Sequence, residues 1–307
     1  MALQRVAALR LTPALVALAG ASLAAPSHAL APAERVEFAS LDKDVTVQAL
    51  YFRPPGAAPD KPVPLVIAAH GCGGMYSDSP ARRDQLSERS IAWTDMLVAD
   101  GYAVLWPDSF NSRGRRSVCL VKRGEPSITP FTRRLDILGA LAYAASQPGI
   151  DRKRVALLGW SHGGSTTLAT VNGKDPRIAR FFAAANAPPQ LVGAVAFYPG
   201  CVASLRRDSE WLPSLPLRIH TGELDDWTPS PSCVALADEA RPRGADMTVT
   251  VYPGAYHGFD APSGKTRVWK EVTTGANADK GVTLGPDPAA RDAATQSVRA
   301  FLKERLQ

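Results

Sequence analysis

A short glycine-rich motif behind an apolar run constrains this 307-residue chain more than any other feature. The motif is Gly159-Trp160-Ser161-His162-Gly163-Gly164, and the apolar run 155–158 that precedes it has the character of a buried strand. A G-x-S-x-G motif between a strand and a helix is typical of a nucleophile elbow, a sharp turn that lifts a serine hydroxyl to within reach of a base. The motif therefore predicts Ser161 as a nucleophile and a helix that continues through residues 165–171.

Two later turns supply candidates for the acid and the base in the chain order that this architecture imposes. The strand-like residues 216–220 precede a carboxylate-rich turn, and the strand-like residues 247–252 precede a glycine-flanked loop that holds a histidine. We favour Asp225 as the acid because its spacing from the strand aims a carboxylate at the histidine loop. Asp226 and Glu223 stay open as alternatives, and a solvated turn that caps a helix over residues 230–240 is the simpler explanation for the remaining acids.

The base is chosen by elimination, because the chain contains only five histidines. His28 lies in an expected leader, and His70 precedes the serine. His162 is the neighbour of Ser161, and His220 sits in or at the end of a strand, where a structural role is expected. His257 remains as the predicted base.

The electrophilic part of the site is expected after the buried strand 64–69. That strand runs into His70-Gly71-Cys72-Gly73-Gly74-Met75, and in this architecture such a loop supplies one oxyanion N–H while the residue after the nucleophile supplies the other. We therefore predict the backbone N–H groups of Cys72 and His162 as the oxyanion hole. A glycine-rich turn without an electrostatic task is the alternative.

Taken together, these motifs resemble the dienelactone hydrolase family of α/β-hydrolases. The similarity runs from about residue 62 to the C-terminus, and its most specific piece is Tyr252-Pro253-Gly254-Ala255-x-His257-Gly258-Phe259-Asp260. The resemblance implies ester or lactone hydrolysis, a single α/β domain with a mostly parallel eight-stranded sheet covered by helices on both faces, and no metal. Founding members carry a cysteine nucleophile where this chain has Ser161, and this departure favours the chemistry of an ordinary serine esterase over a dienelactone substrate.

The first 29 residues have the pattern of a secretory signal. Arg5 and Arg10 stand before an apolar stretch without acids, and Ser27-His28-Ala29 fits a cleavage site. A membrane anchor is the alternative, but Pro13, Gly20 and Pro26 interrupt the run, which is shorter than a spanning helix needs. We expect one domain over residues 30–307 in the periplasm or the medium, without a stable membrane anchor after cleavage.

Charge and cysteine content narrow the function further. Loss of the leader removes two arginines and lowers the formal charge from +6 to +4, and no basic block with interleaved aromatics points to nucleic acid. In an oxidising compartment the four cysteines allow three pairings, of which we favour Cys201 with Cys233 and Cys72 with Cys119 because they join loops at neighbouring strand ends. No C-x-x-C or H-E-x-x-H spacing occurs, so we expect neither a metal nor a cofactor.

The substrate is the least constrained expectation. Aromatic and apolar side chains near the predicted site, which either form an apolar pocket or simply pack the loops, are Trp160, Trp227, Met75, Tyr76 and Tyr256. Two long polar connections, 111–134 and 260–287, have the length of lids or binding loops. The arginines of the first, among them Arg115 and Arg116, suggest an anionic substrate or merely a solvated surface.

The sequence thus predicts a secreted serine hydrolase of carboxylic esters or lactones that acts on a small molecule. A peptidase or an acyltransferase with the same triad is the alternative, since a fold does not determine the acceptor. A noncatalytic binding protein is a further alternative, which the complete triad disfavours. The oligomeric state stays open.

Overall fold

The computed structural model describes residues 32–307 except 123, 126, 185–188, 208–209 and 275–278, so the expected leader lies outside the described residues. Eight strands form one sheet in the order β1-β2-β4-β3-β5-β6-β7-β8. β2 pairs antiparallel with both β1 and β4, and the other neighbours are parallel. The strands are β1 (Ala33–Ala39), β2 (Thr46–Phe52), β3 (Val63–Ala69), β4 (Ala103–Pro107), β5 (Ile150–Trp160), β6 (Leu191–Phe197), β7 (Leu217–Gly222) and β8 (Met247–Tyr252). This is the mostly parallel sheet that the sequence predicts.

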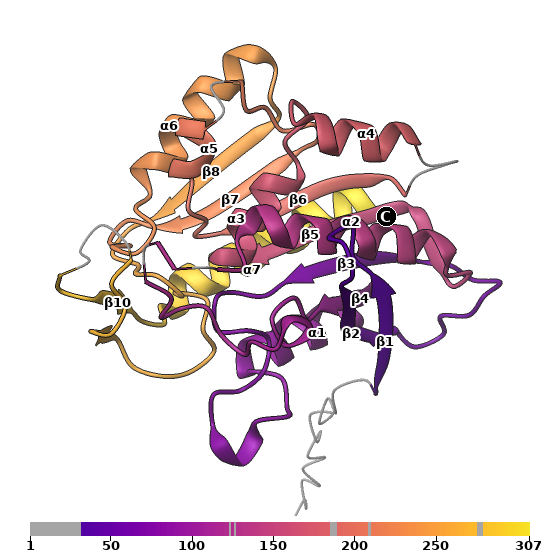
Figure 1. Ribbon diagram of the computed structural model, residues 1–307, viewed down its shortest axis with the longest axis horizontal. Helices are drawn as coiled ribbons and strands as arrows, with labels where there is room; N and C mark the ends of the chain where they lie inside the picture. The colour runs from indigo at the N-terminus through magenta and orange to yellow at the C-terminus, as the bar shows by residue number, and fades with distance from the viewer. Residues whose placement is uncertain (1–31, 123, 126, 185–188, 208–209, 275–278) are drawn as a thin grey trace, which may run out of the picture.

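Helices cover both faces of the sheet (Figure 1). They are α1 (Glu88–Ala99), α2 (Pro130–Ser146), α3 (His162–Thr170), α4 (Pro176–Ala184), α5 (Val202–Arg207), α6 (Pro231–Ala240) and α7 (Pro288–Leu306). One core cluster joins the sheet to α2, α3, α4 and α6, and a second joins the opposite face to α1 and α7. The single α/β domain expected from the sequence is therefore confirmed.

The central strand β5 shows why the sheet is buried on both sides. Val155 and Leu157 belong to the first core cluster, whereas Ala156 and Leu158 belong to the second. Alternate residues of a strand point to opposite faces, so a continuous apolar run needs a helical layer on each side. This two-sided burial fixes the register of β5 and with it the position of the elbow at its carboxyl end.

Several expected element bounds change in the structure. The predicted loop 111–134 ends earlier, because α2 begins at Pro130 with Thr129 as its N-cap; the side chain of Thr129 accepts a hydrogen bond from the Thr132 N–H. The predicted loop 260–287 contains a two-stranded antiparallel sheet, β9 (Arg267–Trp269) and β10 (Val282–Leu284). These short strands lie at the edge of the site and form part of its wall.

Two disulfides tie the loops at the carboxyl edge of the sheet, and they are the pairs that we favour from the sequence. Cys72 is joined to Cys119, and Cys201 is joined to Cys233. Each restricts the unfolded chain and contributes about 2–4 kcal/mol to stability. Within the described part of the chain, no helix has the length and apolar character required to cross a membrane.

Candidate active site

Ser161 lies on a strained turn between β5 and α3. Its backbone angles are φ 52° and ψ −113°. Residues other than glycine adopt this region only when the surrounding structure enforces it. The two motif glycines make the turn possible, because a Cβ atom on Gly159 would overlap the Gly163 carbonyl and one on Gly163 would overlap the Ala69 carbonyl. The turn therefore holds the serine at the carboxyl end of β5, where the loops after β3, β7 and β8 also meet.

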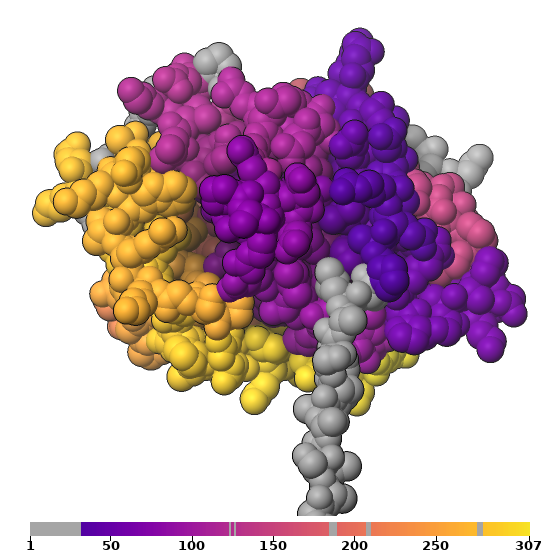
Figure 2. Space-filling model, turned by 90° about the horizontal axis from the view of Figure 1, so that it is seen from below, coloured from indigo at the N-terminus to yellow at the C-terminus, as the bar shows by residue number. Residues whose placement is uncertain are grey.

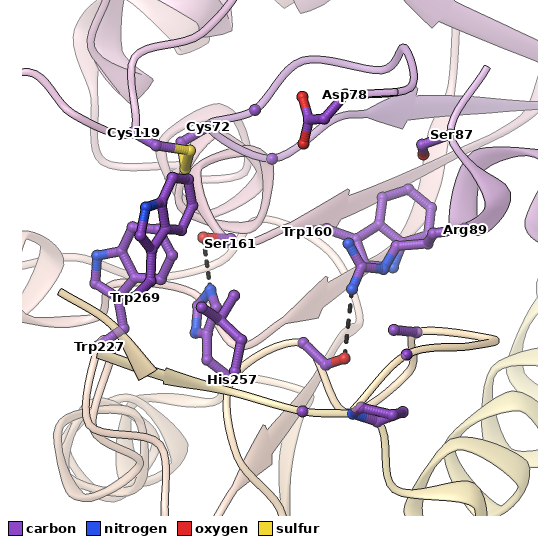
Figure 3. Close-up of a pocket in the computed structure, with 18 of the residues that line it drawn as sticks. Cys72, Asp78, Ser87, Arg89, Cys119, Trp160, Ser161, Trp227, His257 and Trp269 are labelled. Carbon is purple, nitrogen blue, oxygen red and sulfur yellow. Dashed lines mark hydrogen bonds between the residues drawn. A yellow bond between two sulfur atoms is a disulfide. The ribbon is translucent and has the colours of Figure 1, made fainter. Parts of the chain in front are cut away.

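Hydrogen bonds join the three residues that the sequence predicts as a triad. Nε2 of His257 lies 2.9 Å from Oγ of Ser161, and Nδ1 lies 2.8 Å from Oδ2 of Asp225 (Figure 3). With Nδ1 donating to the carboxylate, Nε2 is left free to accept the serine proton. The arrangement is that of a nucleophile, a general base and an orienting acid.

Thr228 is a fourth member of this group that the sequence analysis missed. Its Oγ1 lies 3.0 Å from Oδ2 of Asp225, 3.1 Å from Nδ1 of His257 and 2.9 Å from the Tyr198 carbonyl oxygen. The backbone N–H groups of Trp227 and Thr228 donate to Oδ1 of Asp225 at 2.9 and 2.8 Å. The carboxylate is therefore held at both oxygens, and one oxygen faces the imidazole.

The two competing acids have other partners. Asp226 accepts hydrogen bonds from the N–H and the hydroxyl of Thr283 at 2.7 and 2.9 Å. Glu223 accepts one from the Gly254 N–H at 2.9 Å. Asp226 thus anchors β10 and Glu223 fastens a turn, and the geometry favours Asp225 over both.

The loop after β3 and the first turn of α3 lie side by side as the oxyanion prediction requires. A Cβ atom on Gly71 would come within 3.8 Å of the Ser161 Cβ, so the loop passes directly against the elbow. His162 is the first residue of α3, and the N–H groups of a first helical turn have no partner within the helix. Among the described backbone hydrogen bonds outside regular elements, neither Cys72 nor His162 donates its N–H.

Of the remaining histidines of the described chain, His70 and His220 are buried and His162 is partly buried, and all three are neutral. Burial is the main cause that lowers the pKa of His162 to about 3 and that of His220 to about 4. It also holds the pKa of His70 well below its usual value. Nδ1 of His220 lies 2.9 Å from the Tyr252 hydroxyl, in accord with the structural role expected for it. At neutral pH these imidazoles act as hydrogen-bonding groups rather than as cations.

A pocket of about 460 Å³ opens above Ser161. It lies between the segment that contains β9 and β10 and the chain leading into α1, where Figure 2 shows a hollow in the surface. On one side of Ser161 are Trp227, Trp269 and the Cys72–Cys119 disulfide, and on the other is Arg89 (Figure 3). The pocket is therefore apolar and aromatic at one end and polar at the other. No three His, Cys, Asp or Glu side chains within the described ranges come together as a metal site.

Of the five side chains that we expect to bind substrate, three line the pocket and two do not. Trp227 and Tyr76 line the pocket, and so does Trp160, although it is only 2% exposed and its ring stacks on Trp106 at 5.3 Å. Met75 is a correction, because it is 1% exposed and packs in the core under α1. Tyr256 is a second correction: it is not among the lining residues, and its side chain is partly exposed whereas that of the neighbouring His257 is buried and faces Ser161.

Of the two explanations left open for the arginine-rich connection, a role in the pocket is disfavoured, since neither Arg115 nor Arg116 lines the pocket. Arg116 donates to the carbonyl oxygens of Ser77 and Arg83. Arg113 pairs with Asp136 and Asp42 at 2.8 and 2.9 Å. These cations fasten loops, and the pocket takes its positive charges from Arg89, Lys265 and Arg267 instead.

The sequence model of the dienelactone hydrolase family matches residues 47–306. The chain belongs to the dienelactone hydrolase family. A protein of Fusarium vanettenii named "Probable dipeptidyl-aminopeptidase B" is 30% identical over 142 residues, which are 44% of this chain and 14% of that protein. The chain therefore matches only a small part of this curated relative.

Solved structures share the fold at low sequence identity. The dienelactone hydrolase-like promiscuous phosphotriesterase P91, from metagenomic libraries, has a TM-score of 0.61 and 18% identity over 90% of this chain and 99% of its own. Esterase 2 of Thermogutta terrifontis has a TM-score of 0.56 and 16% identity over 90% of this chain and 96% of its own. These neighbours show the fold, and membership of the dienelactone hydrolase family supports a hydrolase activity.

Asp260 organises a second hydrogen-bond network beside the triad of this dienelactone hydrolase family member. Its buried carboxylate accepts four hydrogen bonds, from Nε of Arg89 (3.0 Å), Nε1 of Trp93 (3.1 Å), Nε1 of Trp160 (2.9 Å) and the hydroxyl of Tyr198 (2.6 Å). The Tyr198 ring in turn lies 4.5 Å from the His257 ring. Asp260 thus links the histidine loop to the elbow, to β6 and to α1. Its place in the most specific family motif was the only sequence signal of this role.

We expect Asp260→Ala to lower the free energy of unfolding by on the order of 3–5 kcal/mol, because it leaves buried donors and a half-buried guanidinium without their acceptor. Urea unfolding followed by tryptophan fluorescence measures this loss. Asp292→Ala is the matched control, since Asp292 is 65% exposed and pairs with Arg291 on the surface, where such a pair contributes roughly 0–1 kcal/mol. Equal losses in the two variants would contradict the structural role of Asp260.

Proposed function

We propose that the protein is an exported serine hydrolase that cleaves carboxylic esters or lactones. The observation that carries the proposal is the continuous hydrogen-bonded chain from Ser161 through His257 to Asp225 at the base of the pocket. A polar group array of this kind, next to backbone N–H groups that have no acceptor among the described backbone hydrogen bonds outside regular elements, suits acyl transfer. The two disulfides and the pattern of the leader support a site of action in the periplasm or the medium.

The mechanism follows from the positions of these groups. Nε2 of His257 takes the proton from Oγ of Ser161 as Oγ bonds to the carbonyl carbon, and the carbonyl electron pair moves onto oxygen. The N–H groups of Cys72 and His162 stabilise that oxyanion. The imidazolium, oriented and stabilised by Asp225, then gives its proton to the departing alkoxide. Water attacks the acyl-enzyme with His257 again as base, and the acid leaves while Ser161 recovers its proton.

The shape of the pocket favours an ester with an aromatic group. Trp227 and Trp269 lie nearly perpendicular at 6.0 Å between ring centroids, and Trp227 also lies 4.8 Å from the His257 ring. A planar ring placed between these indoles and the disulfide gains both apolar burial and edge-to-face contacts. We therefore propose short-chain and aromatic esters as better substrates than cis-dienelactone, and peptides as poor ones because an amine leaves less readily.

A substrate panel tests this proposal. It compares kcat/KM for methyl acetate, phenyl acetate, methyl benzoate, cis-dienelactone and a peptide anilide. We expect one of the two aromatic esters to lead the panel. A higher kcat/KM for the peptide or for the dienelactone than for every simple ester would assign the site to the peptidase or lactonase alternative.

The aromatic wall is tested by Trp269→Leu. We expect kcat/KM for the preferred aromatic ester to fall roughly tenfold, the equivalent of about 1.4 kcal/mol for a lost ring contact, while methyl acetate changes less than twofold. Val268→Ala is the matched control, since Val268 is the adjacent residue of β9 and is 53% exposed. An unchanged preference in Trp269→Leu would return that side chain to a packing role.

A further inference from the structure

Arg133 is a buried cation of α2 that contacts both segments of the proposed oxyanion hole. It is 1% exposed. Its Nη1 donates to the carbonyl oxygen of His70 at 2.8 Å and lies 3.0 Å from Nδ1 of His162. A single nitrogen therefore joins the loop after β3 to the first residue of α3, which are far apart in the sequence.

These two contacts lie next to the predicted donors. The His70 carbonyl begins the peptide unit that precedes Gly71, and the following peptide unit carries the N–H of Cys72. The second contact is made to the side chain of His162, whose own backbone N–H is the other donor. One guanidinium thus contacts both segments that carry these N–H groups, and Arg133 itself does not line the pocket.

Burial determines the charge states of Arg133 and His162. The pKa of Arg133 is lowered to about 9, mainly by burial, so the guanidinium stays protonated at neutral pH. His162 is neutral, because its pKa is lowered to about 3, and its Nδ1 can accept a hydrogen bond from Nη1 of Arg133. Arg134, the next residue of α2, pairs with Asp175 at 2.6 Å, whereas none of the ion pairs among the described residues includes Arg133.

A buried cation without a direct carboxylate partner is costly, so its retention needs a compensating interaction. Aromatic rings supply part of it: the guanidinium carbon lies 4.8 Å from the centre of the Phe110 ring. The same ring contacts the rings of His70 at 4.7 Å and His162 at 5.6 Å. Phe110 thereby packs the two segments and the arginine into one unit.

We propose that Arg133 is a positioning residue for the oxyanion hole, an inference that rests on the proposed hydrolase function. It fixes the N–H groups of Cys72 and His162 relative to each other, and its positive charge adds to the potential around the oxygen that becomes negative as the Ser161 Oγ–carbon bond forms. The negative charge on the substrate oxygen exists only in the tetrahedral state. Loss of Arg133 therefore acts on kcat and leaves binding of the uncharged ester nearly unchanged.

The test compares Arg133→Met, Arg133→Lys and the control Arg134→Met. Methionine fills the space without donors, lysine keeps one charged donor, and Arg134→Met removes a buried arginine of the same helix that does not contact the oxyanion segments. We measure kcat and KM for p-nitrophenyl acetate, and Ki for butaneboronic acid, whose tetrahedral serine adduct places a negative oxygen in the oxyanion hole. Ki for butan-1-ol, an uncharged alcohol with the same butyl group as the boronic acid, reports binding without that charge.

For Arg133→Met we expect kcat to fall and the boronic acid Ki to rise, both by on the order of 10²-fold, as for the loss of one oxyanion donor. KM and the alcohol Ki should stay within about twofold, and Arg133→Lys should recover kcat to within about tenfold of the wild type. Arg134→Met should keep its kcat even where its melting temperature falls. If Arg133→Met does not fold, the lysine variant carries the test, because its kcat and boronic acid Ki must still change together.

Two results would overturn the inference. One is a kcat for Arg133→Met no lower than that of Arg134→Met, and the other is a parallel loss in kcat, KM and alcohol binding, which indicates a general packing defect. Failure of the proposed function is a separate result: the wild-type protein would then hydrolyse no ester, or would hydrolyse esters unchanged after Ser161→Ala.

Discussion

Replacement of Ser161 by alanine is expected to lower kcat for p-nitrophenyl acetate by on the order of 10⁴-fold or more, because no acyl-enzyme can then form. His257 and the N–H groups of Cys72 and His162 remain, so a weak residual rate from bound water is all that is expected. The fold should be retained, since alanine keeps the Cβ that the elbow already holds at φ 52°. Steady-state kinetics and thermal unfolding measure the two effects.

Ser165→Ala is the matched control for the nucleophile. Ser165 lies one turn further along α3, and its Oγ accepts the Gly200 N–H at 2.8 Å rather than contacting His257. We expect this variant to keep kcat within about fivefold of the wild type, because it loses two ordinary hydrogen bonds, that from the Gly200 N–H and a longer one of 3.3 Å to the Ser161 carbonyl oxygen, and no contact with His257. A fluorophosphonate probe should label wild-type protein at Ser161, and labelling mapped by mass spectrometry to any other serine would contradict the assignment.

Asp225→Asn is expected to lower kcat by on the order of 10⁴-fold, and the structure gives the reason. The N–H groups of Trp227 and Thr228 require an acceptor at the Oδ1 position. The amide oxygen must therefore take that position, which places the amide NH₂ opposite Nδ1 of His257. Nδ1 then accepts a hydrogen bond, so that Nε2 carries the proton and can no longer act as a base toward Ser161.

Asp226→Asn separates this effect from a general change of charge in the turn. Asp226 binds the N–H and the hydroxyl of Thr283, so the variant alters the anchor of β10 and leaves the imidazole tautomer unchanged. We expect less than a tenfold loss in kcat. If Asp226→Asn were the more damaging substitution, the role of orienting acid would move to Asp226.

The aromatic end of the pocket is formed by loops that also contact the candidate triad. Trp269 of β9 and Leu284 of β10 form part of the pocket wall, and neither strand belongs to the eight-stranded sheet. A parallel bridge between His257 and Leu284, together with the Gly285 N–H donated to the His257 carbonyl, holds this wall against the base. The pocket wall and the candidate triad are thus built on one connected set of loops.

Local chemistry accounts for what the sequence predicted well. The elbow around Ser161 was recognisable because glycine spacing and an apolar run act over a few neighbouring residues. Asp225 and His257 followed from the rule that parallel strands present their carboxyl ends at one edge. The cysteine pairs followed from the same rule, since the loops that they join leave that edge.

Tertiary contacts decided the rest. Asp260 bonds to Arg89, which lies 171 residues away, and Arg133 bonds to His70 and His162 across the β3 and α3 segments. Trp269 lies in a polar stretch whose short strand pairing could not be read from periodicity. Met75 was expected in the pocket for the same reason, although its side chain lies in the core. The sequence therefore determined the fold class and the candidate triad, because turn chemistry and strand patterning are local. The tertiary structure alone decided the pocket wall and the supporting networks, because burial and hydrogen bonding join residues that no local pattern relates.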